Sequence, residues 1–399
     1  MPGGRETDHS CTDDCNRANL AHGIPLTCGD AATTHCGLLR GLLSAGSERV
    51  EDVRAVDIDL AGLPQEYAVA RPEARDADEV AELLIDYERR ATGSSAVTVD
   101  SVRETLIGIR SWTRRQALVR DSDSGRLLAW LSVHDRAAGR VLVDCIVTPD
   151  LGDGLDEALA GQLFAAAERY AADIAALRDL RWTLLDSGAF DGDPRQQRFL
   201  DLAGYSHVRT WLQMSRPVTA AEATSLPGPR EGVTVRRVER HPDGLPVAED
   251  LQAVHQVLEE SFADHFSSYR ESFPEFVMRL REVPGHRWDH WWLAEIDTPE
   301  GTMAAGALVS SESPPGADGR WGSYVDYIGV HRRARGRGVA KALLHTVIAD
   351  AASRGRGRVD LEVDADSPTG ADGLYASLGW VTVQRTQSWH RDLELKDTA

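Results

Sequence analysis

An arginine- and glycine-rich run, Arg333 to Gly338, lies between an apolar stretch and a segment of helical periodicity. The apolar stretch is Tyr324 to Val330, and the apolar residues of Val339 to Ala351 recur at three- and four-residue spacing. This order predicts a strand, a tight turn and a helix. Gly336 leaves room for a ligand beside the backbone. The free N–H groups and the dipole of the helix, together with three arginines, favour a polyanionic ligand such as a pyrophosphate.

The glycine spacing excludes two common nucleotide-binding motifs. No Gly-Lys-Ser/Thr follows the turn, as a P-loop requires, and the spacing differs from that of a dinucleotide fingerprint. A second pattern lies downstream of the helix. Val359, Leu361 and Val363 alternate with charged residues, which predicts a strand, and Tyr375 lies in a short segment that ends in Leu-Gly-Trp at Trp380.

The two patterns together resemble a known family. The turn Arg333-x-x-Gly336-x-Gly338, with Tyr375 about forty residues downstream, resembles the acetyl-coenzyme A site of the GCN5-related N-acetyltransferase (GNAT) superfamily. The resemblance implies an α/β (α+β) fold, in which a central mixed, mostly antiparallel sheet is flanked by helices. It also implies an enzyme, an N-acetyltransferase that uses acetyl-coenzyme A as its acyl donor.

The chain of 399 residues is long enough for two such domains, and its pattern repeats. Arg198 to Tyr205 corresponds to Gly373 to Trp380, and Ile146 to Gly154 corresponds to Gly329 to Gly338. The chain therefore resembles the tandem type of GNAT protein, to which mycothiol synthases and related actinobacterial acetyltransferases belong.

These patterns divide the chain into four segments. We expect a poorly structured extension over residues 1–64, a degenerate GNAT domain over 65–217 (the first copy), a linker over 218–232, and the catalytic, acetyl-coenzyme A-binding GNAT domain over 233–399 (the second copy). Within the first copy, the periodicity of Ser101 to Trp112 predicts one continuous helix.

The first copy has lost the features that favour a coenzyme. Its turn is one residue shorter, has no arginine, and carries Asp150 and Asp153, whose charges repel a pyrophosphate. Phe199 or Leu200 occupies the position of Tyr375. We expect the first copy to be structural or to shape the substrate site, and a second, weak coenzyme site is the alternative.

The resemblance assigns the coenzyme contacts to the second copy. Backbone N–H groups of the turn are expected to bind the pyrophosphate, and an N–H group of the preceding strand to face the thioester oxygen. Ser367 stands where many relatives have an Asn that contacts the coenzyme. The predicted cofactor-binding residues are Ile328, Val330, Arg333, Arg335, Gly336, Arg337, Gly338, Val339 and Ser367.

Acetyl transfer to an amine needs a general base and a general acid. The resemblance makes Tyr375 the acid, and a packed core aromatic is the alternative. Asp326 is the first candidate for the base, with Glu362 and Asp364 on the neighbouring strand as alternatives. No cysteine occurs in the second copy. A cysteine acyl-enzyme is therefore excluded there, and direct attack in a ternary complex is favoured.

The acceptor is expected to contact Asp264 and His265, because the family usually shapes its acceptor pocket with the loop after the first helix. The formal net charge of −19 favours a cationic substrate and argues against a nucleic-acid partner, although a solvated acidic surface explains it equally well. We therefore expect acetylation of a small, cationic primary amine. The alternatives are a non-catalytic acyl-coenzyme A sensor or partner module, and mycothiol-synthase-like acetylation of a sugar-thiol amine.

Composition also bounds the compartment and the metal content. No apolar run of membrane-spanning length and no secretory signal are visible, so we expect a cytoplasmic monomer or homodimer without a membrane partner. Four cysteines crowd the N-terminal segment, but they lack the C-x-x-C spacing of a zinc site, so no metal is predicted. They are Cys11, Cys15, Cys28 and Cys36.

Overall fold

The computed structural model describes Leu60 and residues 63–136, 139–152, 154–261, 272–281, 286–316, 318–367 and 370–395. The four clustered cysteines and the acceptor-loop residues Asp264 and His265 lie outside these residues. Within the described part of the chain, no helix combines the length and the apolar character that crossing a bilayer requires. The His, Cys, Asp and Glu side chains of this part form no group of three or more that could hold a metal ion.

The first copy folds as strands and helices in alternation. Its elements are β1 (Tyr67–Ala70), α2 (Ala77–Thr92), α3 (Val99–Leu106), β2 (Arg114–Asp121), β3 (Leu127–Arg136), β4 (Arg140–Val147), α4 (Leu155–Leu177), β5 (Trp182–Phe190), α5 (Pro194–Leu202) and β6 (Ser206–Pro217). The predicted helix over Ser101 to Trp112 is wrong in its extent. It ends early because Gly108 follows, where a Cβ atom would meet the Glu104 carboxylate, and a separate 3-10 helix covers Ile109–Thr113.

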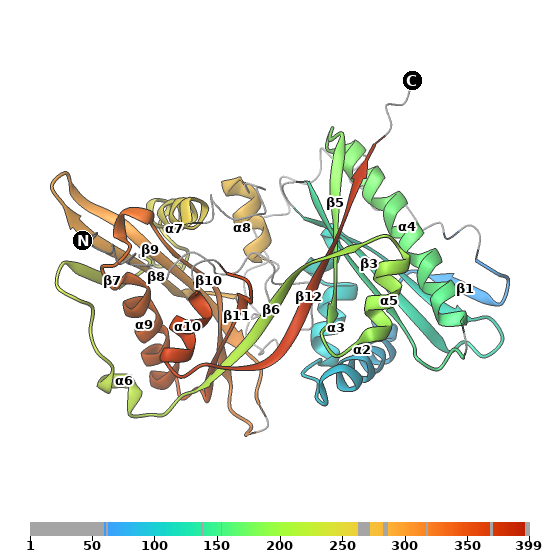
Figure 1. Cartoon of the computed structure of the whole chain (residues 1–399), viewed down its shortest axis with the longest axis horizontal. Coiled ribbons are helices and arrows are strands. Elements are labelled where there is room, and N and C mark those ends of the chain that lie inside the picture. The colour runs from blue at the N-terminus through green and yellow to red at the C-terminus, as the bar shows by residue number, and fades with distance from the viewer. Residues whose placement is uncertain are drawn as a thin grey trace, which may run out of the picture.

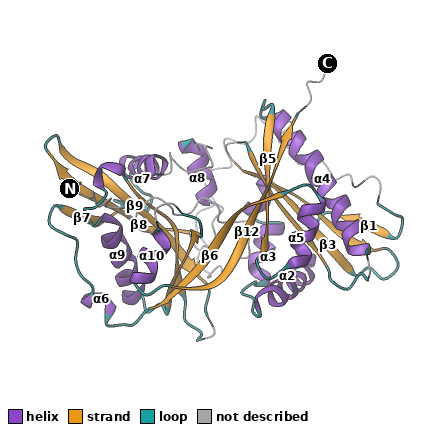
Figure 2. Cartoon of the chain, viewed as in Figure 1, coloured by secondary structure: helices purple, strands orange, loops and turns teal. Residues whose placement is uncertain are grey.

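The second copy repeats this order after the short linker helix α6 (Glu222–Ser225). Its elements are β7 (Val233–Arg237), α7 (Ala248–Ser261), α8 (Phe273–Arg281), β8 (His286–Thr298), β9 (Gly301–Ser313), β10 (Gly322–Val330), α9 (Val339–Ser353), β11 (Arg358–Asp364), α10 (Ala371–Ser377) and β12 (Val381–Glu394). Strands run through the middle of both copies, and helices flank them (Figure 2).

The two copies share one continuous sheet by exchanging their last strands. The strand order is β1-β2-β3-β4-β5-β12-β6-β11-β10-β9-β8-β7. Thus β12 of the second copy pairs with β5 of the first, and β6 of the first copy pairs with β11 of the second. Figure 1 shows β6 and β12 crossing together between the two groups of helices. Among the strands of the described residues, the pairs β4–β5 and β10–β11 are parallel and the others are antiparallel.

Alternating apolar residues pack the sheet on both faces. In β3, Leu131 and Val133 belong to the cluster under α4, whereas Trp130 belongs to the cluster under α2 and α3. One larger cluster fills the second copy, and Trp291 and Trp380 are among its largest fully buried side chains. In the second copy, α7 and α9 pack against the ends of β10 and β9, where the predicted site lies.

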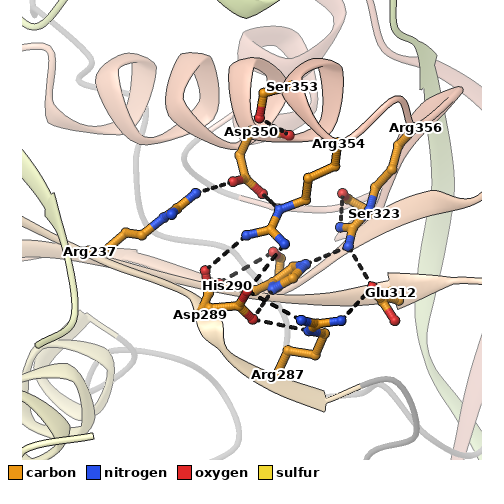
Figure 3. Close-up of polar contacts among 11 residues, drawn as sticks. Arg237, Arg287, Asp289, His290, Glu312, Ser323, Asp350, Ser353, Arg354 and Arg356 are labelled. Atoms are coloured by element: carbon orange, nitrogen blue, oxygen red, sulfur yellow. Dashed lines mark hydrogen bonds and ion pairs between the residues drawn. The ribbon is translucent and has the colours of Figure 1, made fainter. Parts of the chain in front are cut away.

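A cluster of charged side chains ties the C-terminal end of α9 to the sheet (Figure 3). Asp350 of α9 accepts hydrogen bonds from Arg237 of β7 and from Arg354, which follows the helix. The Arg354 guanidinium also lies 3.2 Å from the Asp289 carboxylate of β8. Because Asp289 and Asp350 share Arg354, the cluster balances charge locally and fixes α9 against β7 and β8.

His290 lies at the centre of this cluster and is fully buried. Its Nδ1 atom is 2.8 Å from Asp289 Oδ1, and its Nε2 atom is 2.6 Å from Arg356 Nη2. Arginine can only donate, so Nε2 accepts and the proton of the neutral ring lies on Nδ1. Burial, followed by the charges of Arg356 and Arg354, lowers the pKa of His290 to about 4. The cluster stabilises the end of α9 opposite to the glycine turn.

Candidate active site

The turn before α9 has the backbone geometry of an anion site. Gly336 and Gly338 have φ values of 77° and 86°, in the left-handed region that favours glycine. Gly338 is the N-cap of α9, and no side chain caps the helix there. The Ala342 N–H bonds to the Gly338 carbonyl at 3.0 Å, so the N–H groups before Ala342 have no earlier helical carbonyl to bond. The positive end of α9 is therefore open to an anion.

The predicted arginines surround this turn, but two of them lean towards the β8–β9 hairpin. The Arg333 guanidinium lies 3.7 Å from the Glu300 carboxylate, and Arg337 donates to the Asp297 carbonyl at 3.5 Å. Both contacts are exposed, so they contribute little to stability and leave these side chains able to turn to a phosphate. Arg335 is exposed on the same turn.

A further arginine, which the sequence reasoning missed, reaches the turn from the linker. Arg230 donates to the Gly336 carbonyl at 3.4 Å. Its side chain also lies against Gly338, where a Cβ atom would come within 2.9 Å of Arg230 Cδ. No spacing rule links a linker residue to a turn more than a hundred residues away, so the sequence carried no signal for this contact.

The strands β10 and β11 separate just before the turn. Their parallel register ends at Val325↔Leu361, although β10 continues to Val330, and the pairing of β10 with β9 shifts between Val325 and Tyr327. The His331 N–H bonds to the Ala305 carbonyl of β9 at 2.9 Å. Because successive peptide groups of a strand alternate in direction, the N–H groups of Ile328 and Val330 face away from β9 and into the gap.

Two glycines let helices approach this region from both faces of the sheet. A Cβ atom at Gly329 would lie 2.8 Å from Ser261 Oγ of α7, and one at Gly306 would lie 2.6 Å from Val339 Cγ1 of α9. Gly329 has a packing role, because a residue with a Cβ atom would collide with α7.

Asp326 occupies the irregular position of β10. It is 9% exposed, and Ser311 Oγ donates to its Oδ1 atom at 3.1 Å. Its Oδ2 atom has no hydrogen-bond partner within the described residues. Burial raises the pKa of Asp326 to about 7, although the nearby Arg279 charge of α8 favours the ionised form. Arg279 also bonds to the Tyr327 hydroxyl, so Asp326 and Tyr327 lie on the face of the sheet that α8 covers.

The two alternative bases lie on β11, on the same face of the sheet as Asp326. Tyr324 pairs with Ser311 of β9 and with Asp360 of β11, and paired residues share a face, so Asp360 and the alternating Glu362 and Asp364 lie on the side where Ser311 bonds to Asp326. Glu362 is 3% exposed, and burial raises its pKa to about 8. Burial also raises the pKa of Asp364, which lies 3.3 Å from the Arg209 guanidinium.

Tyr375, the predicted general acid, lies in the core beside the site. Its side chain is 2% exposed, and its ring centroid lies 6.0 Å from that of Trp380. The helix that carries it, α10, packs on β11. Ser367 lies in the turn between β11 and α10, where its N–H bonds to the Asp364 carbonyl at 3.3 Å. The buried ring fits both the acid and the packed-aromatic interpretations, so the role of Tyr375 stays a prediction.

The first copy also separates its parallel strands, but side chains fill the gap. The β4–β5 register ends at Leu142↔Asp186, whereas β4 continues to Val147. Arg195 of α5 donates to the Val147 carbonyl at 3.0 Å and to the Thr148 carbonyl at 2.9 Å. Gln196 donates to the Cys145 carbonyl at 3.2 Å. These bonds satisfy the carbonyl groups that a separated strand exposes.

The second copy has no such side chains at the matching positions. Counting back from the shared helix end, at which Leu200 corresponds to Tyr375, Arg195 and Gln196 correspond to Gly370 and Ala371. Neither glycine nor alanine can reach across the gap. A cavity of about 260 Å³ lies beside Arg195 in the first copy and is also lined by Val147; this volume is smaller than the roughly 300–1,000 Å³ of most small-molecule sites.

Comparison with known proteins gives three sets of matches. Residues 252–380 match the acetyltransferase (GNAT) family. A protein named mycothiol acetyltransferase from Kocuria rhizophila is 28% identical over 299 residues, which cover 73% of this chain and 87% of that protein. One of the same name from Thermobispora bispora is 29% identical over 313 residues, which cover 73% of this chain and 90% of that protein.

Solved structures match nearly the whole described part of the chain. A GCN5-related N-acetyltransferase from Sphaerobacter thermophilus has a TM-score of 0.63 at 23% identity and covers 84% of this chain and 98% of its own. A tandem GNAT protein from the clavulanic acid biosynthesis pathway has a TM-score of 0.56 at 16% identity and covers 83% of this chain and 100% of its own. At these identities the likeness shows the tandem fold alone.

Proposed function

Because the chain belongs to the GNAT superfamily of acetyltransferases, we propose that it transfers the acetyl group of acetyl-coenzyme A to the primary amine of a small, cationic molecule. The observation that carries this proposal is the separation of β10 from β11 after Val325 and Leu361, which lies between an uncapped helix N-terminus and buried carboxylates. We assign the reaction to the second copy, residues 233–399.

The residues of the turn fit the donor. Its pyrophosphate would meet the backbone N–H groups at Gly338 and Val339, with Arg333, Arg335 and Arg337 adding positive charge. The N–H groups of Ile328 and Val330 are free to bond to the pantetheine arm and the thioester oxygen in the gap. A hydrogen bond to that oxygen stabilises the charge that develops there when the amine attacks.

The buried carboxylates fit a cationic acceptor. An ammonium group that approaches Asp326 Oδ2 would supply the hydrogen bond that this atom lacks within the described residues. With its pKa raised to about 7, Asp326 can accept the ammonium proton near neutral pH, and Glu362 adds a second carboxyl group on the same face. The transfer rate should therefore rise with pH through about 7, as Asp326 ionises.

Tyr375 would complete the reaction by donating a proton to the departing sulfur. Acetyl-coenzyme A supplies an activated acetyl group, so a neutral amine can attack it directly and no covalent enzyme intermediate is needed. The second copy contains no cysteine that could form one. The carboxylate and the tyrosine thus account for both proton transfers.

A sugar-thiol amine is the second candidate acceptor. The curated relatives are named mycothiol acetyltransferases, and they align with 73% of this chain in two cases. A thiol-bearing sugar amine is itself protonated at neutral pH and carries hydroxyl groups. The polar side chains that β6 and β11 present beside the gap suit such a molecule.

A thiol-release screen tests the proposed function. Wild-type protein is incubated with acetyl-coenzyme A and a panel of amines that includes polyamines, aminoglycosides, amino acids and a cysteinyl sugar amine. We expect release of coenzyme A thiol with at least one cationic amine, and product acetylated on nitrogen by mass spectrometry. Tight donor binding without transfer to any amine would favour the non-catalytic sensor instead.

A further inference from the structure

The exchanged strand β6 brings polar side chains of the first copy to the acids of β11. The register pairs Asp360 with Ser215 and Glu362 with Gln213. Ser215 Oγ donates to Asp360 Oδ1 at 2.6 Å, and Gln213 Nε2 donates to Glu362 Oε2. Each of these two buried acids of the second copy thus has a partner on a strand of the first copy.

Of these acids, Glu362 is the one placed at the gap. It follows Leu361, the last β11 residue that pairs with β10, so it lies where the two strands begin to separate. It lies on the same face of the sheet as Asp326, because Asp360 and Ser311 both pair with Tyr324 and Ser311 bonds to Asp326. Asp360 instead lies opposite Tyr324, where β10 and β11 are still paired and leave no gap.

We propose that Gln213 is a positioning residue for acetyl transfer: it holds the Glu362 carboxyl group beside the gap, so the first copy completes the acceptor side of the site. This inference rests on the proposed function. Gln213 bonds to Thr386 Oγ1 of β12 at 3.3 Å as well, so both exchanged strands fix its amide group. A domain that binds no donor is then still required for acceptor recognition.

Several charged groups face Glu362 and set its ionisation. Burial raises its pKa most, the Gln213 hydrogen bond lowers it, and the charge of Asp364 raises it. Arg209 of β6 partners Asp364, and Asp326 lies across the gap with Arg279 of α8 nearby. Among these groups Gln213 favours the ionised carboxylate, which is the form that attracts an ammonium group.

The test replaces Gln213 by methionine, which keeps the volume and removes the donor. For Gln213→Met we expect kcat/KM for the amine to fall about tenfold at pH 7, because one hydrogen bond to a charged group is lost. Two carboxyl groups shape the acid limb of the kcat/KM profile, Asp326 near pH 7 and Glu362 near pH 8, and only the Glu362 step should move to higher pH, by about one unit. The dissociation constant for acetyl-coenzyme A should stay within about twofold, because the donor turn is untouched.

Ser215→Ala is the matched control, because it removes the neighbouring bond of the same strand to the same acidic strand. It should leave both kcat/KM and the pH profile unchanged. Equal effects of the two variants, or an unchanged acid limb in Gln213→Met, would overturn the inference while wild-type acetyl transfer still supports the proposed function. Should Gln213→Met unfold, Glu362→Gln tests the same link, and wild-type acceptor kinetics in that variant would refute it. Absence of transfer by the wild-type protein would overturn both.

Discussion

Both copies separate two parallel strands at the same place, yet helix side chains bond to the separated strand in the first copy. In the first copy, Arg195 and Gln196 of α5 bond to carbonyl groups of β4 and its following turn, whereas the matching positions of the second copy are Gly370 and Ala371. The backbone differs there as well, because Arg195 lies inside α5 whereas Gly370 is the left-handed N-cap of α10. Two copies of one fold can therefore share a strand separation and differ in what lies beside it.

The filled gap and the exchanged strands together explain why the first copy persists as a domain. Arg195 gives the exposed carbonyl groups of β4 permanent partners, which removes the need for a ligand there. Strand β6 of the first copy pairs with β11 of the second, and its Gln213 donates a hydrogen bond to the buried Glu362. Under the proposals above, the second copy binds the donor and the first copy contributes to acceptor recognition.

The largest expected effect comes from charge and bulk at the donor turn. Gly338→Glu should weaken acetyl-coenzyme A binding about a thousandfold, because it strains a φ of 86°, crowds Arg230 and repels a pyrophosphate. Gly154→Glu is the matched variant of the first copy, with a φ of 82° and open space around it. It should leave binding unchanged in isothermal titration calorimetry. Equal losses in the two variants would remove the distinction between the copies.

Replacing Tyr375 should lower the rate of acetyl transfer without weakening donor binding. Tyr375→Phe keeps the ring that packs on Trp380, but it removes the proposed proton donor. We expect kcat to fall on the order of 10²-fold, with little change in KM for acetyl-coenzyme A. The fall of kcat at high pH should also change or vanish in Tyr375→Phe, because the group proposed to lose its proton there is gone. Wild-type kcat with an unaltered profile would mean that Tyr375 serves packing alone, as Leu200 does in the first copy.

Introducing the side chains of Arg195 and Gln196 at the matching positions of the second copy should weaken donor binding. The double variant Gly370→Arg with Ala371→Gln places the side chains of Arg195 and Gln196 beside β10. Donor affinity should fall roughly 10- to 100-fold as these groups compete for the strand. Gly370→Ala is the control, because it measures the strain of a φ of 62° without reaching the gap. Unchanged donor affinity in the double variant would show that these two side chains do not explain the expected difference in donor binding between the copies.

The last prediction concerns stability and not catalysis: the second copy should lose stability in acid. The pKa of His290 falls from 6.5 to about 4 on folding, so the unfolded chain binds the proton first as the pH drops. The stabilisation is complete above about pH 6.5 and is lost progressively towards pH 4, by up to about 3 kcal/mol. His290→Gln should flatten this part of the stability curve in urea titrations.

The difference between the wild-type and His290→Gln curves isolates this histidine. Asp326 and Glu362 have raised pKa values, so they change stability with pH in the opposite direction in both proteins. Parallel curves over pH 4–6.5 would show that the cluster around His290 does not bias its protonation.

The sequence predicted the local parts of this molecule better than the distant ones. The strand, the glycine turn and α9 are adjacent in the chain, so periodicity and two glycines revealed them. The duplication and the α/β fold were also predicted, and the tandem GNAT structures confirm them. The extent of α3 was wrong, because the helix ends at Leu106, before Gly108, and glycine disfavours a helix interior.

Contacts between distant segments carried no such signal. Two hydrogen bonds join residues more than a hundred positions apart: that of Arg230 to the donor turn and that of Gln213 to Glu362. The strand exchange likewise joins distant segments of the chain. The sequence named Asp326, but its bulge and its unpaired oxygen depend on the register of β9 and β10. Such features depend on packing, which a single sequence does not encode locally.

The number of acetyl-coenzyme A sites per chain tests the central claim most directly. Isothermal titration calorimetry of the wild-type protein should give one tight site per chain, because Arg195 and Gln196 fill the gap of the first copy. Gly338→Glu should abolish that site without exposing another. Two sites of equal affinity, or one that survives Gly338→Glu and disappears with Gly154→Glu, would contradict the account.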